Sequence, residues 1–143
     1  AKDLAQRIIA DNKLCYLATA SLDGTPEVAT IQYAEKGFLL YFKTFRGYRK
    51  FVNLNMNPVA SIAITPHSTS LLSGHTLQLD GAVEFLDHPQ IARDLLIAKH
   101  GISPYFNDER VRYFCFAPQS GQVLMDGHYP PKYEKLIFTE LTC

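Results

Sequence analysis

The sequence lacks several features that would each mark a particular class of protein. It contains no tryptophan, only three cysteines and, with 14 basic and 14 acidic residues, no formal net charge. No stretch approaches about 18 consecutive apolar residues, so we expect no membrane-spanning helix. A neutral chain without a long basic track is a poor candidate for nucleic-acid binding. Charges throughout the first 11 residues exclude the apolar centre of a signal peptide, and we expect a cytoplasmic protein.

The cysteines and histidines do not suggest a metal site. Cys15, Cys115 and Cys143 are an odd number without metal-ligand spacing, so we expect reduced thiols. None of the five histidines is paired at i, i+4 or lies beside a cysteine, so no metal ligand is predicted. His67 and His75 flank a polar loop, which could bring them to the cleft of a neighbouring subunit.

The order of apolar runs and turns predicts a mainly β fold in one domain, residues 1–143. Asp23-Gly24 and the turn at 35–37 connect three successive strands into an antiparallel meander. Gly81 indicates a bulge or bend. We predict six or seven antiparallel strands in a small closed or split β-barrel with short peripheral helices. Helices are expected at 3–12, 47–57 and 87–101, and strand character at 14–21, 27–33, 37–44, 59–64, 76–86, 111–117, 121–125 and 135–141.

The aromatic residues exceed what one small barrel interior can hold. Six of them alternate along two strands, so some must be covered by the peripheral helices or by a second subunit. We therefore expect an obligate homodimer. The six are Phe38, Tyr41, Phe42, Tyr113, Phe114 and Phe116.

Positive charge is concentrated in one segment. From Lys36 to Leu79 there are five basic residues and no Asp or Glu. Arg49 and Lys50 fall in the first turn of the helix expected at 47–57, where an anion would use both the side chains and the free backbone N–H groups. The pattern fits either a solvated basic face or a phosphate site, with Lys43 and Thr44 at the end of the preceding strand.

At this point the sequence resembles a known family. The hairpin LATASLDGTPEVATIQY, the strand GFLLYFKT and the segment YRKFVNLNMNPVASIAI resemble the pyridoxamine 5′-phosphate oxidase-like family of FMN-binding split barrels. The resemblance implies a homodimer with FMN bound between the subunits and a small-molecule substrate.

The resemblance also assigns the cofactor-binding residues. Arg49 and Lys50 would hold the FMN phosphate, with Lys43 and Thr44 beside them, although Tyr48 stands where family members commonly have Ser. The strand residues would run along the ribityl chain and the isoalloxazine largely through backbone groups, and Thr76 would supply a polar side chain. These strand residues are Ala29, Thr30, Ile31 and Gln32.

The resemblance is incomplete at the C-terminal end. The oxidases that give the family its name share a segment there that contains Trp and Arg, which the tail GHYPPKYEKLIFTELTC does not match. We therefore expect an FMN-dependent oxidoreductase with a substrate other than pyridoxamine phosphate, and we assign no catalytic residue. An F420-dependent reductase of the same barrel and a non-enzymatic flavin-binding module remain the alternatives.

Overall fold

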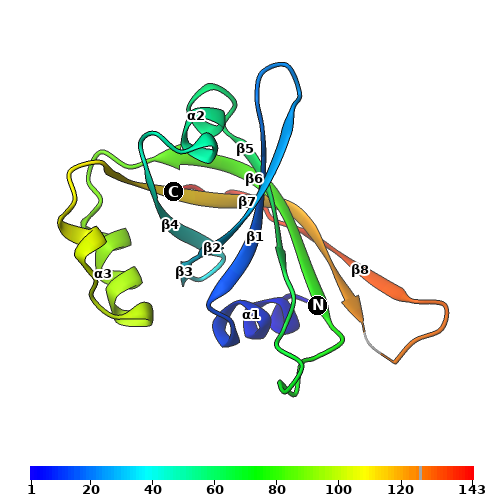
Figure 1. Cartoon of the computed structure of the whole chain (residues 1–143). Coiled ribbons are helices and arrows are strands. Elements are labelled where there is room, and N and C mark those ends of the chain that lie inside the picture. The colour runs from blue at the N-terminus through cyan, green and yellow to red at the C-terminus, as the bar shows by residue number, and fades with distance from the viewer. Residues whose placement is uncertain (126) are drawn as a thin grey trace.

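The computed structural model describes residues 1–125 and 127–143 and is mainly β, as predicted (Figure 1). Its helices are α1 (Lys2–Asp11), α2 (Arg49–Met56), α3 (Gln90–His100) and the 3-10 helix η1 (Pro104–Asn107). No described helix is both long enough and apolar enough to cross a membrane. The strands are β1 (Leu14–Ala20), β2 (Pro26–Gln32), β3 (Ala34–Lys36), β4 (Leu39–Phe45), β5 (Val59–Ile64), β6 (Thr76–Phe85), β7 (Val111–Met125) and β8 (Lys132–Ile137).

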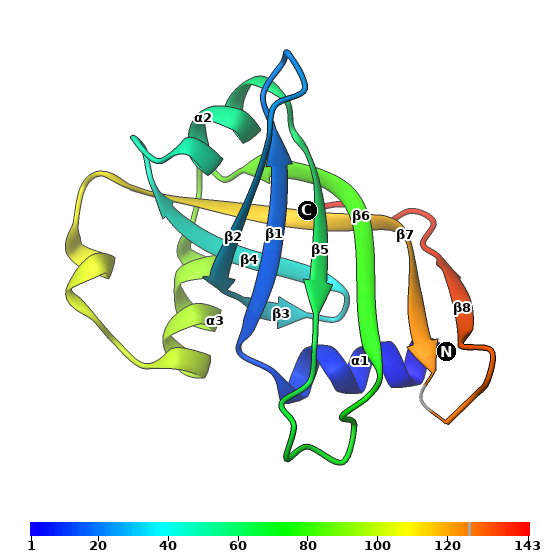
Figure 2. The ribbon, with the colours of Figure 1, turned by 45° about the vertical axis from the view of Figure 1, so that its right-hand side comes forward.

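The strands form one curled antiparallel sheet that does not close. Its order is β2-β1-β5-β6-β7-β4-β3, and β8 pairs with the far half of β7. Within the described residues β2 pairs only with β1, and β3 pairs with β4 only at residues 39–41. Figure 2 shows β2, β1, β5 and β6 side by side, with β7 and β4 crossing behind them. The outer backbone edge of β2 is therefore free of strand partners, and the split-barrel prediction is confirmed.

The strand count of six or seven is wrong, because the described residues contain eight. Part of the turn expected at 35–37 is the short strand β3, and the two expected segments at 111–117 and 121–125 form the single strand β7. Proline interrupts a regular ladder, but Pro118 lies at a register shift opposite Gly81. The bulge predicted at Gly81 thus lets β6 and β7 pair along their full length.

Two apolar layers form on opposite faces of β4 and β7. Phe42 stacks on Phe114 inside the barrel, with ring centroids 4.9 Å apart, and α1 contributes residues to this interior cluster. Tyr41 and Tyr113 face the other way and pack with the apolar side of α3. Strand alternation explains the division, because neighbouring side chains point to opposite faces. The aromatic residues expected to need cover are thus largely covered within one chain, by the barrel and by α3.

The expectation of reduced thiols is wrong for two of the three cysteines. Cys115 on β7 and Cys143 form a disulfide, with their Cα atoms 5.9 Å apart. The two residues are 28 positions apart, and only the return of the tail toward β7 brings them together. Cys15 is a free, buried thiol, and burial raises its pKa to about 12.

Candidate functional site

The predicted phosphate-binding residues lie where β4 ends and α2 begins. A turn with a hydrogen bond from the Tyr48 N–H to the Phe45 carbonyl oxygen, 3.0 Å, links the two elements. No side chain caps the N-terminus of α2, and its first turn contains no acidic residue. The free N–H groups and the positive end of the helix dipole therefore coincide with Arg49 and Lys50. An anion is the ligand that this arrangement favours.

A cavity of about 210 Å³ lies beside this helix start. Lys50 lines it, and the Lys50 Nζ lies 4.9 Å from the centroid of the Tyr48 ring. Lys43 lies on the same cavity with its Nζ 5.0 Å from the Phe106 ring, and burial lowers the pKa of Lys43. Two lysines and an aromatic wall thus surround a space that suits a small anionic group.

Thr44 also lines this cavity, and its side chain carries an unpartnered polar atom. Its side chain is 5% exposed, and its Oγ1 has no hydrogen-bond partner among the described residues. A buried hydroxyl without a partner costs about 1–3 kcal/mol, so such groups are normally satisfied. A ligand oxygen that reached the Thr44 Oγ1 would supply the missing partner. The residues present therefore fit a phosphate group.

Arg49 is engaged differently from Lys50. Its Nε lies 3.0 Å from the Glu27 Oε2, and its side chain is 70% exposed. The pair connects the start of α2 to β2, with the Glu27 side chain largely covered and the Arg49 side chain exposed to solvent. Of the two predicted phosphate ligands, only Lys50 lines the cavity, whereas Arg49 lies outside its lining.

The four predicted residues of β2 divide by exposure. Ile31 is buried in the interior cluster, Ala29 is half-buried, and Thr30 and Gln32 are exposed. The Ile31 side chain therefore packs in the core, and its backbone is the part available to a ligand. The free edge of β2 makes backbone contacts sterically feasible, and the assignment of these residues to a cofactor stays a prediction.

Within one chain, Thr76 lies far from the basic residues at the start of α2. It begins β6, whereas Phe85 at the other end of that strand packs on Phe51 of α2, with ring centroids 5.0 Å apart. Strands extend by about 3.4 Å per residue, so β6 separates Thr76 from α2 by roughly 30 Å along its length. Within one chain, Thr76 and the start of α2 therefore lie at opposite ends of β6.

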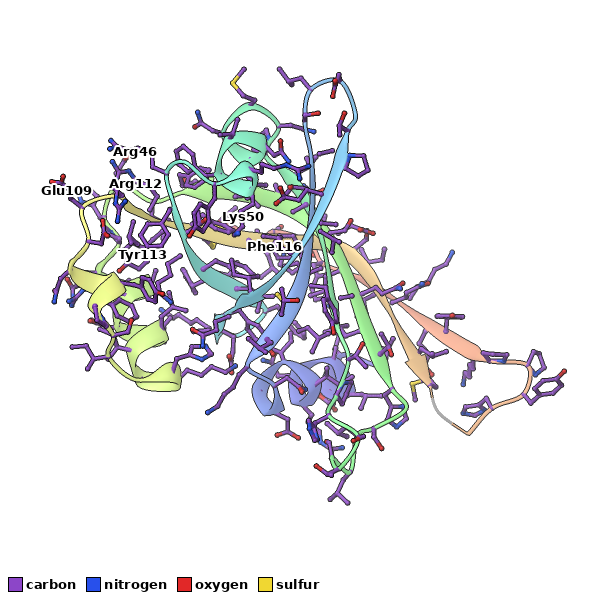
Figure 3. The ribbon with its side chains drawn as sticks, viewed as in Figure 1. Arg46, Lys50, Glu109, Arg112, Tyr113 and Phe116 are labelled. Atoms are coloured by element: carbon purple, nitrogen blue, oxygen red, sulfur yellow. A yellow bond between two sulfur atoms is a disulfide. The ribbon has the colours of Figure 1, made fainter. Side chains whose placement is uncertain are left out.

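Sequence reasoning missed the residues that β7 and η1 contribute. Arg112 pairs with Thr44 across β4 and β7, and its Nη1 donates to the carbonyl oxygens of Glu109 and Val111. Tyr105 completes the cavity wall. Figure 3 shows Arg46, Arg112 and Lys50 at the same end of the barrel. No local motif predicts this grouping, because strand pairing joins Thr44 to Arg112, which is far away in the sequence.

The chain is similar to known proteins in sequence and in fold. The family model described as pyridoxamine 5′-phosphate oxidase matches residues 1–120. No curated protein matches the chain significantly. Similar solved structures include a heme binding protein from Mycobacterium smegmatis, with a TM-score of 0.81 and 20% identity over 95% of this chain and 57% of that chain.

Two further structures are similar. The heme storage protein HutZ from Vibrio cholerae has a TM-score of 0.69 and 16% identity over 80% of this chain and 87% of that one. An F420 reductase has a TM-score of 0.68 and 21% identity over 81% and 94% of the two chains. At such identities the likeness shows the fold alone. The chain also spans little more than half of the Mycobacterium smegmatis protein.

Proposed function

This chain belongs to the pyridoxamine 5′-phosphate oxidase-like family of split barrels, and on that premise we propose that it is an FMN-binding oxidoreductase. The observation that carries the proposal is the unpartnered hydroxyl of Thr44, a residue that lines the same cavity as Lys50, beside the uncapped start of α2. These groups supply hydrogen-bond donors and positive charge at one point. The proposed ligand group is the FMN phosphate.

The protein's part in this function is to bind and orient the cofactor. Lys50 and the first N–H groups of α2 would neutralise the phosphate, and the Thr44 hydroxyl would donate a hydrogen bond to it. The free edge of β2 would contact the rest of the cofactor through backbone groups. Bound FMN would supply hydride-transfer chemistry, which the described side chains do not themselves provide.

The similar structures define the alternatives to be tested. A related fold is named as an F420 reductase, and others are named as heme-binding or heme-storage proteins. F420 also carries a phosphate group, so the cavity beside α2 does not by itself separate it from FMN. A flavin-binding module without catalysis would use the same contacts and lack turnover.

Titration of the purified protein with each cofactor tests the proposal. We expect FMN to bind at one molecule per chain, with quenched flavin fluorescence, and riboflavin to bind much more weakly because it lacks the phosphate. The visible spectrum distinguishes flavin, deazaflavin and haem by their different bands. Preferential binding of F420 or of haem, with no binding of FMN, would contradict the proposal.

We further propose that the cofactor site is completed by a second copy of this chain. Apolar side chains are exposed along the outer face of the sheet, including Tyr16 (50%), Val28 (69%) and Ile137 (61%). These three line a hollow of about 580 Å³ across the sheet. Exposed apolar patches of this kind mark interfaces. A partner on this face would also provide a route for Thr76 to reach a shared site.

The dimer is tested by sedimentation equilibrium at micromolar concentration. We expect twice the chain mass of 16.1 kDa, because an interface on this face should exceed about 1,000 Å². Ile137→Lys should shift the equilibrium toward monomer by placing a charge in the interface. Leu71→Lys is the matched control, because Leu71 is 97% exposed in a loop. A wild-type monomer that binds FMN stoichiometrically would contradict the dimer.

A cytoplasmic location stays a prediction. Disulfides such as Cys115–Cys143 persist mainly in oxidising compartments. The disulfide therefore argues against the location of this protein in a reducing cytoplasm. Cell fractionation combined with thiol labelling would decide between these locations.

A further inference from the structure

A second cavity lies at the opposite end of β2 from α2. Its volume is about 390 Å³, and it is lined by the end of α1, the start of β1, Thr30 of β2 and the segment after β5. The side chains that matter to the argument are Asp11, Lys13, Tyr16, Thr30, Thr65 and His67. Thr30 is one of the predicted cofactor-strand residues, so this cavity adjoins the proposed flavin site without sharing the phosphate-binding residues.

His67 presents a defined hydrogen-bonding group. The Thr69 backbone N–H donates to the His67 Nδ1 at 3.3 Å, and the Thr69 hydroxyl lies 2.9 Å from the same nitrogen. Because Nδ1 accepts a backbone N–H, the proton of the neutral imidazole is on Nε2. The described residues offer Nε2 no partner. His67 therefore has a free N–H donor on a ring that lines the cavity.

The other lining groups favour a ligand with acceptor oxygens. Lys13 has an exposed ammonium without a side-chain partner among the described residues, and the hydroxyl groups of Thr30 and Thr65 lie on exposed side chains. Tyr16, which also lies on the face proposed for the second copy, is 50% exposed and supplies an aromatic surface. Asp11 is the one acidic side chain in the lining. Two groups here only donate, Lys13 and the His67 Nε2, and one only accepts, Asp11, so a small planar carboxylate or carbonyl compound is the complementary ligand.

The position of the cavity relates it to the proposed cofactor. Glu27, near the other end of β2, pairs with Arg49 at the start of α2. Glu27 and Thr30 are three residues apart, which corresponds to roughly 10 Å of extended strand. FMN has its phosphate at one end and its redox-active ring at the other. A phosphate held beside α2, with the ribityl chain running along β2 as proposed above, would leave the ring end toward the cavity at Thr30.

We propose that this cavity is the substrate subsite, and that His67 Nε2 and Lys13 bind the carboxylate or carbonyl oxygen of a small planar substrate. That the ligand is a substrate rests on the proposed flavin function. That a ligand binds in this cavity depends only on the residues that line it. His67 is thus assigned a binding role that sequence spacing alone did not support.

The test uses benzoate as the probe and the full chain loaded with FMN. We expect saturable benzoate binding by calorimetry, accompanied by a shift of the His67 ring proton resonances. Removing a hydrogen bond to a charged group should weaken binding about tenfold or more in His67→Ala and in Lys13→Met. His67→Gln should recover part of the loss, because its amide can donate from a similar position.

The controls separate this site from the cofactor site. FMN affinity should be unchanged in His67→Ala, and His88→Ala, an exposed histidine outside the cavity, should bind benzoate like the wild type. Equal benzoate affinity in wild type, His67→Ala and Lys13→Met would overturn the proposal, as would no binding at all. If the chain takes up no FMN and the chain without FMN still binds benzoate in a His67-dependent way, the ligand site stands and the flavin function is wrong.

Discussion

Replacing Arg49 and Lys50 together by alanine is expected to weaken FMN binding at least about a hundredfold and to leave riboflavin binding nearly unchanged. A charge-assisted hydrogen bond contributes roughly 1.5–3 kcal/mol, so the loss of the Lys50 contact together with the nearby positive charge of Arg49 has an effect of this size. Riboflavin lacks the phosphate, so it cannot lose contacts that it never makes. Fluorescence titration of both ligands into the wild type and the double variant measures the difference.

The structure divides this effect between the two residues. Lys50 lines the cavity, whereas Arg49 is 70% exposed and paired with Glu27, so Lys50→Ala should account for most of the loss. Lys36→Ala is the matched control, since Lys36 is an exposed lysine on β3 outside the cavity. Equal losses for FMN and riboflavin would show that the pair does not contact the phosphate. Unchanged FMN affinity in the double variant would show that FMN does not bind at the start of α2.

Thr44→Val tests the unpartnered hydroxyl separately. Valine has nearly the shape of threonine without the hydroxyl, so the protein without cofactor should be at least as stable as the wild type. FMN affinity should fall, because the phosphate would lose a hydrogen-bond donor. A marked loss of stability without FMN would instead show that the Thr44 hydroxyl already has a partner.

Gly81→Ala is expected to destabilise the fold by about 3 kcal/mol, near the upper end of ordinary overpacking effects. A Cβ at this position would overlap the Ala117 carbonyl oxygen and lie 2.8 Å from the Pro118 Cα. Both are backbone atoms of β7 and cannot move without disturbing the pairing of β6 and β7. For a chain of this size, thermal unfolding should occur about 10 °C lower than in the wild type.

Gly47→Ala provides the control for the glycine prediction. No heavy atom lies within 4 Å of a Cβ built there, and Gly47 is not among the glycines with positive φ. Its melting temperature should therefore stay close to that of the wild type or rise slightly. If Gly81→Ala has the same melting temperature as the wild type, β6 and β7 do not approach each other as the structure describes.

Much of the fold follows from local signals in the sequence. Alternating residues and Asp23-Gly24 predict the β1–β2 hairpin, and Gly81 predicts the irregularity at which the register between β6 and β7 shifts. The basic start of α2 is also local, because Arg49 and Lys50 follow the end of β4 within a few residues. Such features depend on backbone preferences and on the spacing of side chains over a few residues. Both can be identified directly in a single sequence.

The tertiary structure decides what distant segments do together. It pairs Thr44 with Arg112, continues β7 through Pro118 and joins Cys115 to Cys143. It also separates Thr76 from Lys50, although the resemblance assigns both to one cofactor. Register between strands that are far apart in the chain is set by which faces can be buried and which groups can pair. Burial of a strand face and pairing of its backbone groups are defined only once the sheet has formed. A short stretch of sequence therefore does not predict the register between distant strands.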